Sequence, residues 1–363
     1  MIYRAMGLMS GSSLDGLDIV FVELDDSGGK WNYEIKVADC YAYDDEWQDK
    51  LRSAIKLNGR DYLHLHAAYG AYLANQVNKF IDAHELHHRV QLIASHGHTT
   101  FHEPSNGFTA QLGDGATLAA HTGINVVSDL RAIDIALGGQ GAPIVPVGEK
   151  LLFADHRYFL NLGGIANISI KEDNDFTAFD ICPANRVLNM LAKREGMSFD
   201  EGGAIASSGK LYTPLLTRLN ALDYYQQKQP KSLANSYGTD VLFPLITSFE
   251  LSTADALRTV VEHIVQQIVY AILSLKRQLQ PSQMLVTGGG AFNTFLIKRL
   301  TESLQSLNIS VHVPDEQTVK YKEGLIMALL GILRWREENT VLQSVTGAQR
   351  NSIGGAVWIG QDA

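Results

Sequence analysis

The spacing of apolar positions along the first part of the chain predicts strands followed by helices. Residues 3–9, 17–24 and 32–42 alternate apolar and polar side chains, as half-buried strands do. Apolar side chains then recur at helical spacing over residues 45–57 and 61–86. The chain therefore opens with a predicted meander of three strands, and two amphipathic helices come after it.

Shorter elements are predicted up to residue 146. Apolar runs at 92–94 and 125–127 indicate buried strands, and a helix is predicted over 114–121. The polar stretch after residue 94 predicts a loop at the end of a buried strand, where open α/β sheets place ligand-binding groups. Residues 128–146 are interrupted by three glycines and a proline, which predicts a shaped connector rather than a regular helix.

The second half of the chain repeats this order. The elements predicted there are strands at 157–162, 166–171, 176–180, 284–287 and 309–313 and helices at 185–195, 254–279, 293–305 and 322–338. A polar stretch separates the first of these helices from Lys231, and Ser252 with Asp255 resembles a capping box for the longest one. Two similar runs of elements predict an α/β protein of two related halves with a cleft between them.

Length and charge agree with this organisation. A chain of 363 residues exceeds the size at which one core keeps growing, so two domains are expected. We place the first domain at 1–130 plus the glycine-rich tail 345–363, which is expected to pack back on it, and the second at 131–344. A net charge of −9 argues against a nucleic-acid binder.

The composition also predicts where the protein works. No apolar run of 18 residues occurs, and residues 1–16 contain no long apolar segment, so neither a membrane span nor a signal peptide is expected. The two cysteines, Cys40 and Cys182, lack the spacing of metal ligands. A disulfide framework and a structural zinc site are therefore not expected, and a reducing cytoplasm is.

The first candidate for chemistry is the turn between the two opening strands. Its small or acidic residues are Ser10, Gly11, Ser12, Ser13, Asp15, Gly16 and Asp18. Glycines let backbone amides close on phosphate oxygens, and the serine hydroxyls can join them. The carboxylates would face a phosphate only through a metal ion or water. The alternative is an ordinary tight hairpin turn.

Two further glycine-rich segments occur in the second half. NLGGIAN contains Gly163, Gly164 and Asn167, and the nearby FDICPAN contains Asp180, which ends a predicted strand. A carboxylate in that position can act as a general base during phosphoryl transfer, although it can equally cap the helix near Asn185.

The third segment, VTGGGAFN, places Gly288, Gly289, Gly290 and Asn293 between a strand and a helix. Its glycines let a flat ring or a phosphate approach the backbone, but the Lys-Ser/Thr ending of a Walker A loop is missing. A structural turn is the alternative interpretation.

In combination, these segments resemble the 1,6-anhydro-N-acetylmuramic acid kinase family, a branch of the actin-like, sugar-kinase and heat-shock-70 ATPase superfamily. The resemblance covers nearly the whole chain and is carried by GLMSGSSLDGLD, SHGHTTFHEP, AQLGDG, SDLRAIDIALGGQGAPIVP, NLGGIANIS, FDICPAN, QPKS, VTGGGAFN and SVTGA. It implies two RNase H-like, actin-like ATPase domains with ATP bound in the cleft between them.

The resemblance also implies roles for residues. The segment from Gly11 to Asp18 would cradle the terminal phosphates of ATP, Gly163 and Gly164 would approach them from the second domain, and the segment from Gly288 to Asn293 would hold the adenosine. Mg²⁺ would be bound mainly through ATP, without a dedicated protein site. The residues implied for sugar binding are His96, His98, Thr99 and Arg131.

The reaction implied by the resemblance opens a ring as it phosphorylates. Asp180 would deprotonate a water that attacks C1 of 1,6-anhydro-N-acetylmuramic acid, and Glu323 would orient that water. O6 would leave C1 and accept the γ-phosphoryl group, giving N-acetylmuramic acid 6-phosphate and ADP in peptidoglycan recycling. A cytoplasmic homodimer would match the family.

The chain departs from the family pattern near these segments. The departures are Ser12 for threonine, His98 for glutamine, Ile181 for threonine, Cys182 and Ala184 for glycines, and residues 234–236 after QPKS. The added Cβ atoms are expected to narrow the space beside Asp180. Two alternatives therefore stay open: a kinase for another anhydro- or amino sugar, and an actin-like ATP-binding protein without catalysis.

Overall fold

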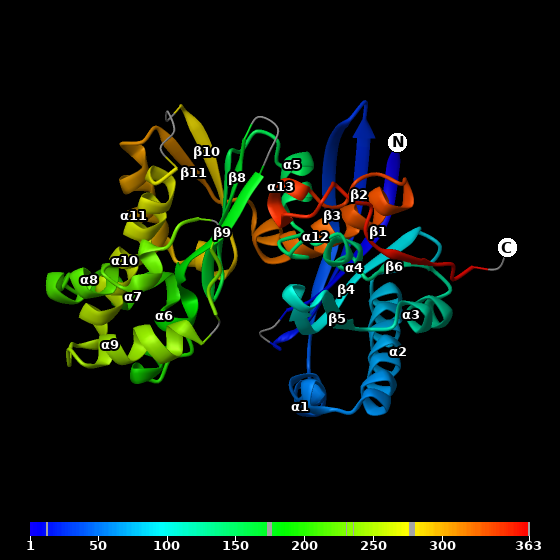
Figure 1. Ribbon diagram of the computed structural model, residues 1–363, viewed down its shortest axis with the longest axis horizontal. Helices are drawn as coiled ribbons and strands as arrows, with labels where there is room; N and C mark the ends of the chain where they lie inside the picture. The colour runs from blue at the N-terminus through cyan, green and yellow to red at the C-terminus, as the bar shows by residue number, and fades with distance from the viewer. Residues whose placement is uncertain (12–13, 173–175, 230, 235, 276–279, 362–363) are drawn as a thin grey trace. The chain divides into compact units, whose positions relative to one another are not determined.

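The computed structural model describes all residues except 12–13, 173–175, 230, 235, 276–279 and 362–363 (Figure 1). Ser12 and Ser13, two of the predicted phosphate-binding residues, thus lie outside the described residues. The chain divides into two compact units, which are Met1–Ala154 with Tyr321–Ala363 (unit 1) and Asp155–Lys320 (unit 2). The sequence analysis instead placed 131–154 and 321–344 in the second domain.

Unit 1 is built on one mixed sheet. Its strands are β1 (Ile2–Ser10), β2 (Gly16–Ser27), β3 (Lys30–Ala42), β4 (Leu92–Glu103), β5 (Phe108–Leu112), β6 (Asn125–Ser128) and β12 (Ala356–Trp358). They follow the order β12-β6-β4-β1-β2-β3, and β5 pairs with β4. β2 is antiparallel to β1 and β3, while β4 is parallel to β1 and β6. The predicted hairpin is confirmed, and β12 shows that the tail does pack on unit 1.

Unit 2 has a smaller sheet with the same plan. Its strands are β7 (Tyr158–Leu162), β8 (Ile165–Lys171), β9 (Phe176–Pro183), β10 (Ser282–Thr287) and β11 (Ile309–His312), in the order β11-β10-β7-β8-β9. β7, β8 and β9 form an antiparallel meander, and β10 is parallel to β7 and β11. Each sheet contains an antiparallel meander of three strands followed by two strands parallel to its first one, and the unit 1 sheet adds the antiparallel strands β5 and β12. This RNase H-like topology confirms the prediction of two related α/β halves.

The helices of unit 1 are α1 (Asp45–Ser53), α2 (Gly59–Ala83), α3 (Gly115–Thr122), α4 (Ala132–Ala136), α5 (Pro146–Leu152), α13 (Gln343–Thr346) and most of α12 (Glu316–Trp335). Polar side chains start the first helices. Asp44 accepts a hydrogen bond from the Trp47 amide, and Asn58 accepts one from the Asp61 amide, so each satisfies a donor that the helix leaves free.

The helices of unit 2 are α6 (Asn185–Ala192), α7 (Ala204–Ser208), α8 (Thr213–Asn220), α9 (Phe243–Thr247), α10 (Thr253–Leu273) and α11 (Thr294–Gln305). α10 buries its apolar stripe in the core of the unit, and Ser252 caps it by accepting from the Asp255 amide at 3.1 Å. It ends at Leu273, and residues 276–279 of the predicted helix lie outside the described residues.

Three local predictions need correction. β4 continues to Glu103, where a loop was expected, because β5 pairs with its polar second half. A five-residue helix, α4, lies inside the predicted connector at 128–146. The polar stretch before Lys231 contains α7 and α8, which the sequence analysis missed because these helices are too short to show a clear period.

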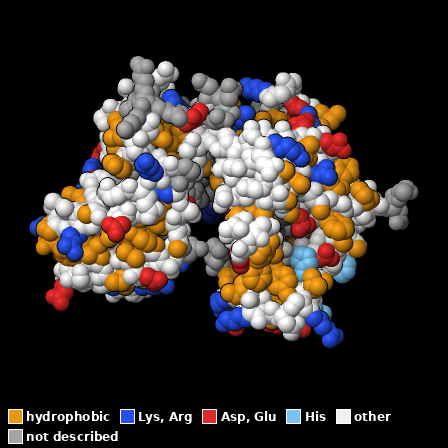
Figure 2. Space-filling view, in the orientation of Figure 1, with side chains coloured by type: hydrophobic (Ala, Val, Ile, Leu, Met, Phe, Trp, Pro, Cys, Tyr) orange, Lys and Arg blue, Asp and Glu red, His pale blue; other side chains and the backbone are white. Residues whose placement is uncertain are grey.

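The surface agrees with the acidic composition. On the face shown in Figure 2, lysine and arginine side chains are scattered among acidic ones and form no single basic patch. Among the described residues, no helix combines the length and the apolar character that a membrane span needs.

Helices cover both faces of the unit 1 sheet. Met6 and Leu8 of β1 belong to the core cluster that contains Tyr69 and Phe80 of α2. Gly7, between them, faces the other way, as alternation along a strand requires. A Cβ on Gly7 would overlap the Gly324 carbonyl of α12, so the two backbones are in direct contact there. This contact explains why the chain after Tyr321 belongs to unit 1.

Replacing Gly7 with alanine tests this close approach. We expect Gly7→Ala to destabilise the protein by about 3 kcal/mol, because backbone atoms of α12 cannot move aside as a flexible side chain can. Gly59→Ala is the matched control, since a Cβ at that first position of α2 has no neighbour within 4 Å. The control should change stability by less than about 1 kcal/mol. Urea unfolding measures both, and equal stabilities of the two variants would contradict the proposed contact.

Candidate functional site

The β1–β2 turn is tied to the strands around it. Ser10 ends β1 and is buried, and Gly16 begins β2. A Cβ on Gly16 would lie 2.7 Å from the Cys40 sulfur and 2.8 Å from the Tyr41 carbonyl oxygen, so β3 leaves room only for glycine. The Tyr43 amide donates to the Asp15 carbonyl at 3.4 Å. β1 and β2 therefore form the predicted hairpin, and contacts with β3 and Tyr43 hold Gly16 and Asp15 in place.

A chain of buried hydrogen bonds lies beneath this turn. Ser10 Oγ is 3.0 Å from His98 Nδ1, and the two residues are partners in the parallel ladder of β1 and β4. The Tyr43 hydroxyl donates to Ser10 Oγ at 2.8 Å and lies 2.6 Å from the Tyr69 hydroxyl. Burial lowers the pKa of His98 to about 4 and raises that of Tyr43 to about 12, so both stay neutral at physiological pH.

Carboxylates gather on the same side of unit 1. Burial chiefly raises the pKa of Asp18 to about 6; the charges of Asp15 and Glu323 act in the same direction, and a hydrogen bond from Cys40 opposes them. Burial also raises the pKa of Glu323, while the positive charges of Lys322 and Arg131 lower it. Neighbouring negative charges that help to raise the pKa of Asp18 favour a cation or a proton at this place.

Arg131 is partly buried and close enough to Glu323 for their charges to interact. Its Nε donates to His96 Nε2 at 3.0 Å, and one terminal nitrogen donates to the Gly141 carbonyl at 3.0 Å. Burial lowers the pKa of Arg131 to about 10, whereas the charge of Glu323 raises it. His96 lies 2.8 Å from the Gly97 carbonyl through Nδ1, so it must be the Nδ1–H tautomer that accepts from Arg131.

His96 was predicted to bind the sugar, but the structure uses both of its ring nitrogens inside the protein. Burial, with the Arg131 charge second, lowers the pKa of His96 to about 3, so the ring remains neutral. His96 therefore supports Arg131 from inside the protein and sets the orientation of the Arg131 side chain. Thr99, the other predicted residue of β4, accepts a hydrogen bond from the Gln111 side chain at 3.4 Å.

The loop after α4 is organised by one buried carboxylate. Asp134 Oδ2 accepts from the Gly141 amide at 2.7 Å, and Oδ1 accepts from the Thr346 hydroxyl at 2.7 Å. A Cβ on Gly139 would overlap this carboxylate. The sequence segments GGQGAPIVP and SVTGA, far apart in the chain, thus meet at Asp134 and place the Gly141 carbonyl beside Arg131.

In unit 2, the β7–β8 turn contacts the start of α6. The Gly163 carbonyl accepts from the Asn185 amide at 3.1 Å, and the Gly164 carbonyl accepts from the Ala184 amide at 2.9 Å. A Cβ on either glycine would meet no atom within 3.3 Å in the described structure. Packing inside the described protein does not demand glycine at these two positions.

Glycine is required in the Gly288–Asn293 segment for a different reason. Gly288 has a φ of +81°, and a Cβ there would lie 2.9 Å from the Leu162 backbone. A Cβ on Gly290 would lie 2.6 Å from the Leu162 side chain, while Gly289 is open except for Asn185. The Asn293 side chain accepts from the Leu296 amide and so caps α11. Packing on β7 shapes most of this loop, which agrees with the interpretation of the segment as a structural turn.

Asp180 is a half-buried carboxylate of β9. Its Oδ2 accepts from the Leu233 amide at 2.8 Å and from the Ser232 hydroxyl at 3.2 Å, whereas Oδ1 accepts from no described residue. Burial raises the pKa of Asp180, and the two hydrogen bonds lower it. The alternative of a helix cap is wrong, because the N-cap residue of α6 is Ala184 and no side chain caps the helix. Asn167 is the ladder partner of Asp180 on β8.

Three residues after Asp180 differ from the family pattern that the chain resembles, and all three lie in the core. Ile181, Cys182 and Ala184 are buried and belong to the apolar cluster of unit 2. Their side chains fill the interior of the unit, and the Asp180 carboxylate keeps one open oxygen. The added Cβ atoms were expected to narrow the space beside Asp180, but they change the packing of the core.

Sequence reasoning missed two features of unit 2. Lys231 donates to the Tyr224 carbonyl at 2.8 Å and lies 4.2 Å from the centre of the Tyr224 ring, while the Tyr224 hydroxyl donates to the Asp180 carbonyl. A turn at Gly202 and Gly203, both with positive φ, packs against the start of α11. The paired glycines in DEGG were the available signal for the second feature.

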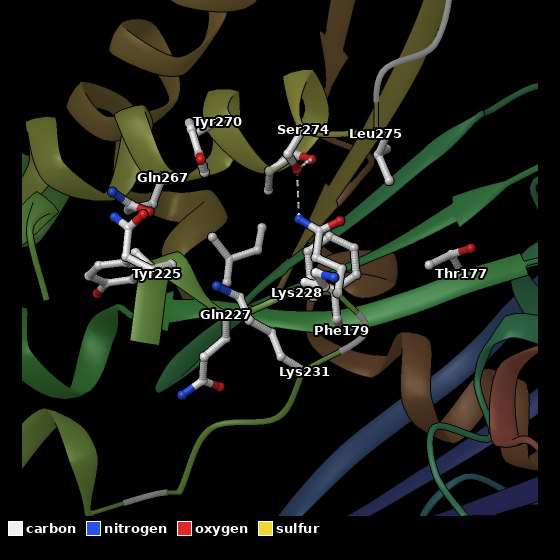
Figure 3. Close-up of a pocket in the computed structure, with 14 residues that line it drawn as sticks. Thr177, Phe179, Tyr225, Gln227, Lys228, Lys231, Gln267, Tyr270, Ser274 and Leu275 are labelled. Atoms are coloured by element: carbon white, nitrogen blue, oxygen red, sulfur yellow. Dashed lines mark hydrogen bonds between the residues drawn. The ribbon is translucent and has the colours of Figure 1, made fainter. Parts of the chain in front are cut away.

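A pocket of about 540 Å³ lies in unit 2 between β9, the segment 225–231 and the end of α10 (Figure 3). Phe179 and Ile181 line it, on either side of Asp180 in sequence, and Gln229 bonds to Ser274 across it at 2.9 Å. None of the predicted site residues lines this pocket. Two segments connect it with Asp180, which are β9 and the segment from Lys231 to Leu233.

Comparison with known proteins identifies the family. A family model described as anhydro-N-acetylmuramic acid kinase matches residues 3–360. This chain belongs to that family. Proteins named anhydro-N-acetylmuramic acid kinase from Sulfurovum sp. and Haemophilus influenzae are each 32% identical to it, and the one from Shewanella amazonensis is 34% identical. The alignments cover 97–98% of this chain and 97–99% of each relative.

Membership of the anhydro-N-acetylmuramic acid kinase family confirms the resemblance found in the sequence. It also confirms the prediction that the protein is a phosphotransferase. A solved structure with a similar backbone is the activator of 2-hydroxyisocaproyl-CoA dehydratase from Clostridium difficile with bound ADPNP. It is 13% identical, with a TM-score of 0.48 over 92% of this chain and 96% of that one.

The Asp134 carboxylate gives a test of the loop beside Arg131. Asp134→Asn is expected to lower stability by about 1–3 kcal/mol, because an amide cannot accept from both the Gly141 amide and the Thr346 hydroxyl. Asp82→Asn, at an exposed ion pair with His87, is the control and should stay within about 0.5 kcal/mol. Thermal unfolding compares the two, and an unchanged Asp134→Asn protein would show that the loop does not depend on this carboxylate.

Proposed function

We propose that this chain is an ATP-dependent kinase that opens 1,6-anhydro-N-acetylmuramic acid with water and phosphorylates O6 of the product. The observation that supports it most is the state of Asp180. One carboxylate oxygen is fixed by the Ser232 and Leu233 donors, and the other accepts nothing from the described residues. A carboxylate held in one orientation, with one open oxygen and a raised pKa, has the properties of a general base.

The phosphate-binding groups are proposed from the two opening turns. Gly163 and Gly164 carry no side chain although the protein would leave room for one, and Gly11 to Asp18 forms the equivalent turn of unit 1. ATP binds between backbone amides of this kind in many folds. The segment from Gly288 to Asn293 would contact the adenosine, with Gly289 as its most open residue.

Mg²⁺ fits the acidic side of unit 1 as a companion of ATP. Asp15 and Asp18 would supply oxygen ligands of the type that Mg²⁺ prefers. Burial is the main cause of the raised pKa of Asp18, and the charges of Asp15 and Glu323, which a cation would offset, add to it. Among the described residues, no three histidine, cysteine or acidic side chains form a metal site. The ion is therefore expected to be held chiefly by the ATP phosphates, where it neutralises charge that develops on them.

The proposed reaction needs a base that removes a proton from water, and it needs no base that removes a proton from the sugar. An anhydro bridge has no free hydroxyl at C6, so an ordinary kinase base has no proton to remove there. Water attacks C1, the C1–O6 bond breaks, O6 forms a bond to the γ-phosphorus, and ADP leaves. Asp180 takes the proton of the water, as the base of an inverting glycosidase does. Glu323 would orient this water, and Arg131 would bind the sugar.

Two further properties belong to the same proposal. A homodimer and a location in the cytoplasm are expected from the family resemblance, and the acidic surface suits a small-molecule substrate better than a nucleic acid. Peptidoglycan recycling is the pathway in which this sugar arises.

Isotope-labelled water gives the most direct test of the proposed function. With ATP, Mg²⁺ and 1,6-anhydro-N-acetylmuramic acid in H₂¹⁸O, we expect one labelled oxygen at C1 of the 6-phosphorylated product and none in the phosphoryl group. Mass spectrometry of the product and its fragments reads both positions. Phosphorylation of an open amino sugar alone would favour the other sugar kinase, and ATP binding without transfer would favour the non-catalytic alternative.

Asp180→Asn tests the base. Turnover should fall by about two to four orders of magnitude while ATP affinity stays nearly unchanged, because the amide cannot take a proton. Asp223→Asn, an exposed residue of the same unit, is the control and should retain turnover. In the unmodified protein, kcat/KM should decrease as pH falls, with a midpoint above about 4, the ordinary value for aspartate, since burial raises the pKa of Asp180. Near-normal turnover of Asp180→Asn would remove Asp180 as the base.

A further inference from the structure

The pocket of unit 2 between β9, the segment 225–231 and the end of α10 contains a buried polar group with an open atom (Figure 3). Gln267 of α10 lines the pocket and is only 7% exposed. Its amide nitrogen donates to Asn220 Oδ1 at 2.9 Å, whereas its amide oxygen accepts from no described residue and remains accessible. Buried polar groups are nearly always paired, so an open acceptor in a pocket indicates a ligand that donates to it.

A hydrogen-bond network behind the pocket fixes a second acceptor. His263 is fully buried, and its Nδ1 lies 2.7 Å from Asn220 Oδ1, an atom that can only accept. Nδ1 therefore carries the hydrogen of this ring, which is neutral because burial lowers the pKa of His263 to about 3. Nε2 must then accept from the Tyr225 hydroxyl at 2.9 Å. Tyr225, which also lines the pocket, has thus used its only hydrogen, and a ligand atom that meets its oxygen must donate.

Two lysines give the same pocket a positive charge. Lys231 is partly buried, and its ammonium group donates to the Tyr224 carbonyl at 2.8 Å. No described carboxylate forms an ion pair with Lys231 or with the exposed Lys228, and burial lowers the pKa of Lys231. Removing a cation from water without a counter-charge is costly, so an anionic group of a ligand would stabilise Lys231.

The pocket is joined to Asp180 by short contacts. The Asp180 amide donates to the Lys231 carbonyl at 3.0 Å, and the Asp180 carbonyl accepts from the Tyr224 hydroxyl at 2.7 Å. Ser232 and Leu233, the next residues along the chain, donate to the Asp180 carboxylate. The bond from the Lys231 ammonium group to the Tyr224 carbonyl ties two of these holders of Asp180 together. A ligand anion that draws this ammonium group away would therefore disturb the orientation of Asp180.

We propose that this pocket is a second binding site, for a small anionic sugar derivative, and that its occupant lowers turnover through the segment that orients Asp180. Hydroxyl or amide N–H groups of the ligand would donate to Gln267 and Tyr225, and its carboxylate or phosphate group would meet the two lysines. Amide side chains beside an aromatic ring such as Phe179 suit a sugar, which has hydroxyls on its edge and C–H groups on its faces. A volume of about 540 Å³ is typical of small-molecule sites.

The product of the proposed reaction belongs to this chemical class. N-acetylmuramic acid 6-phosphate carries a carboxylate, a phosphate, hydroxyls and an amide N–H. Its choice as the ligand, and the effect on turnover, rest on the proposed function. The site itself rests on the pocket and the groups that line it.

Calorimetry with N-acetylmuramic acid 6-phosphate tests the site without turnover. Gln267→Leu should raise Kd by about tenfold, the effect of one lost neutral hydrogen bond to a ligand. Lys228→Glu should raise Kd at least as much by repulsion, and its exposed position leaves folding intact. Gln305→Leu, at an exposed glutamine of the same unit, is the matched control and should keep Kd. Equal Kd values in all three variants would overturn the proposal.

Two further titrations separate this pocket from the proposed catalytic site. Arg131→Met should leave the Kd of the product at the pocket unchanged, and loss of all binding in Arg131→Met would show that the ligand occupies only the catalytic site. N-acetylglucosamine, which lacks both anionic groups, should bind at least about tenfold more weakly than the product. Equal binding of the neutral sugar would contradict the role of the two lysines.

Kinetics test the link to Asp180. With ATP and the anhydro sugar saturating, added product should lower kcat by about fivefold or more, the usual range for coupling between two sites. In Lys228→Glu, the ratio of kcat without and with product should fall toward one. Inhibition that saturating sugar abolishes, or an equal ratio in both proteins, would overturn the link. If the chain phosphorylates no such sugar, the proposed function fails, and calorimetry still decides whether the pocket binds this ligand.

Discussion

Buried polar groups that have to satisfy one another are the constraint on which unit 1 depends. β1, β4 and α4 bring a serine, two histidines and an aspartate into the interior, where an unmade hydrogen bond costs about 1–3 kcal/mol, and a partly buried arginine lies beside them. Each group is therefore given a specific partner. Asp134 holds the loop, the loop and His96 hold Arg131, and Ser10 holds His98. These hydrogen bonds therefore fix the positions of the candidate binding groups.

The glycines of the chain fall into two physical classes, and the sequence does not separate them. Gly7, Gly16 and Gly290 are required because a Cβ would collide with neighbouring strands, helices or side chains. Gly163 and Gly164 have space around them and are required by nothing in the described protein. All of these lie in similar glycine-rich segments. Only the surroundings of each residue show which glycines serve the fold and which are free to serve a ligand.

The sequence was sufficient for most of the architecture. Period-two and period-3.6 patterns located the two meanders and the long helices, because those elements bury one continuous apolar face. It failed where polar residues are buried. β4 was cut short at residue 94 because His96 and His98 do not register as core residues, and the unit boundary was misplaced because the contacts of Arg131 and Gly324 join segments distant in sequence.

The candidate site was predictable as a set of residue types, but not as a set of roles. His96 and His98 belong to one motif, yet one supports Arg131 from behind and the other has a ring nitrogen without a hydrogen-bond partner among the described residues. Asp180 and Asp134 are both carboxylates beside turns, yet only Asp180 has an oxygen without a donor among the described residues. Hydrogen-bond direction separates the two histidines, and the number of donors that reach each oxygen separates the two carboxylates. Because direction depends on every neighbour in the chain of donors and acceptors, it becomes visible only when the strands are in register.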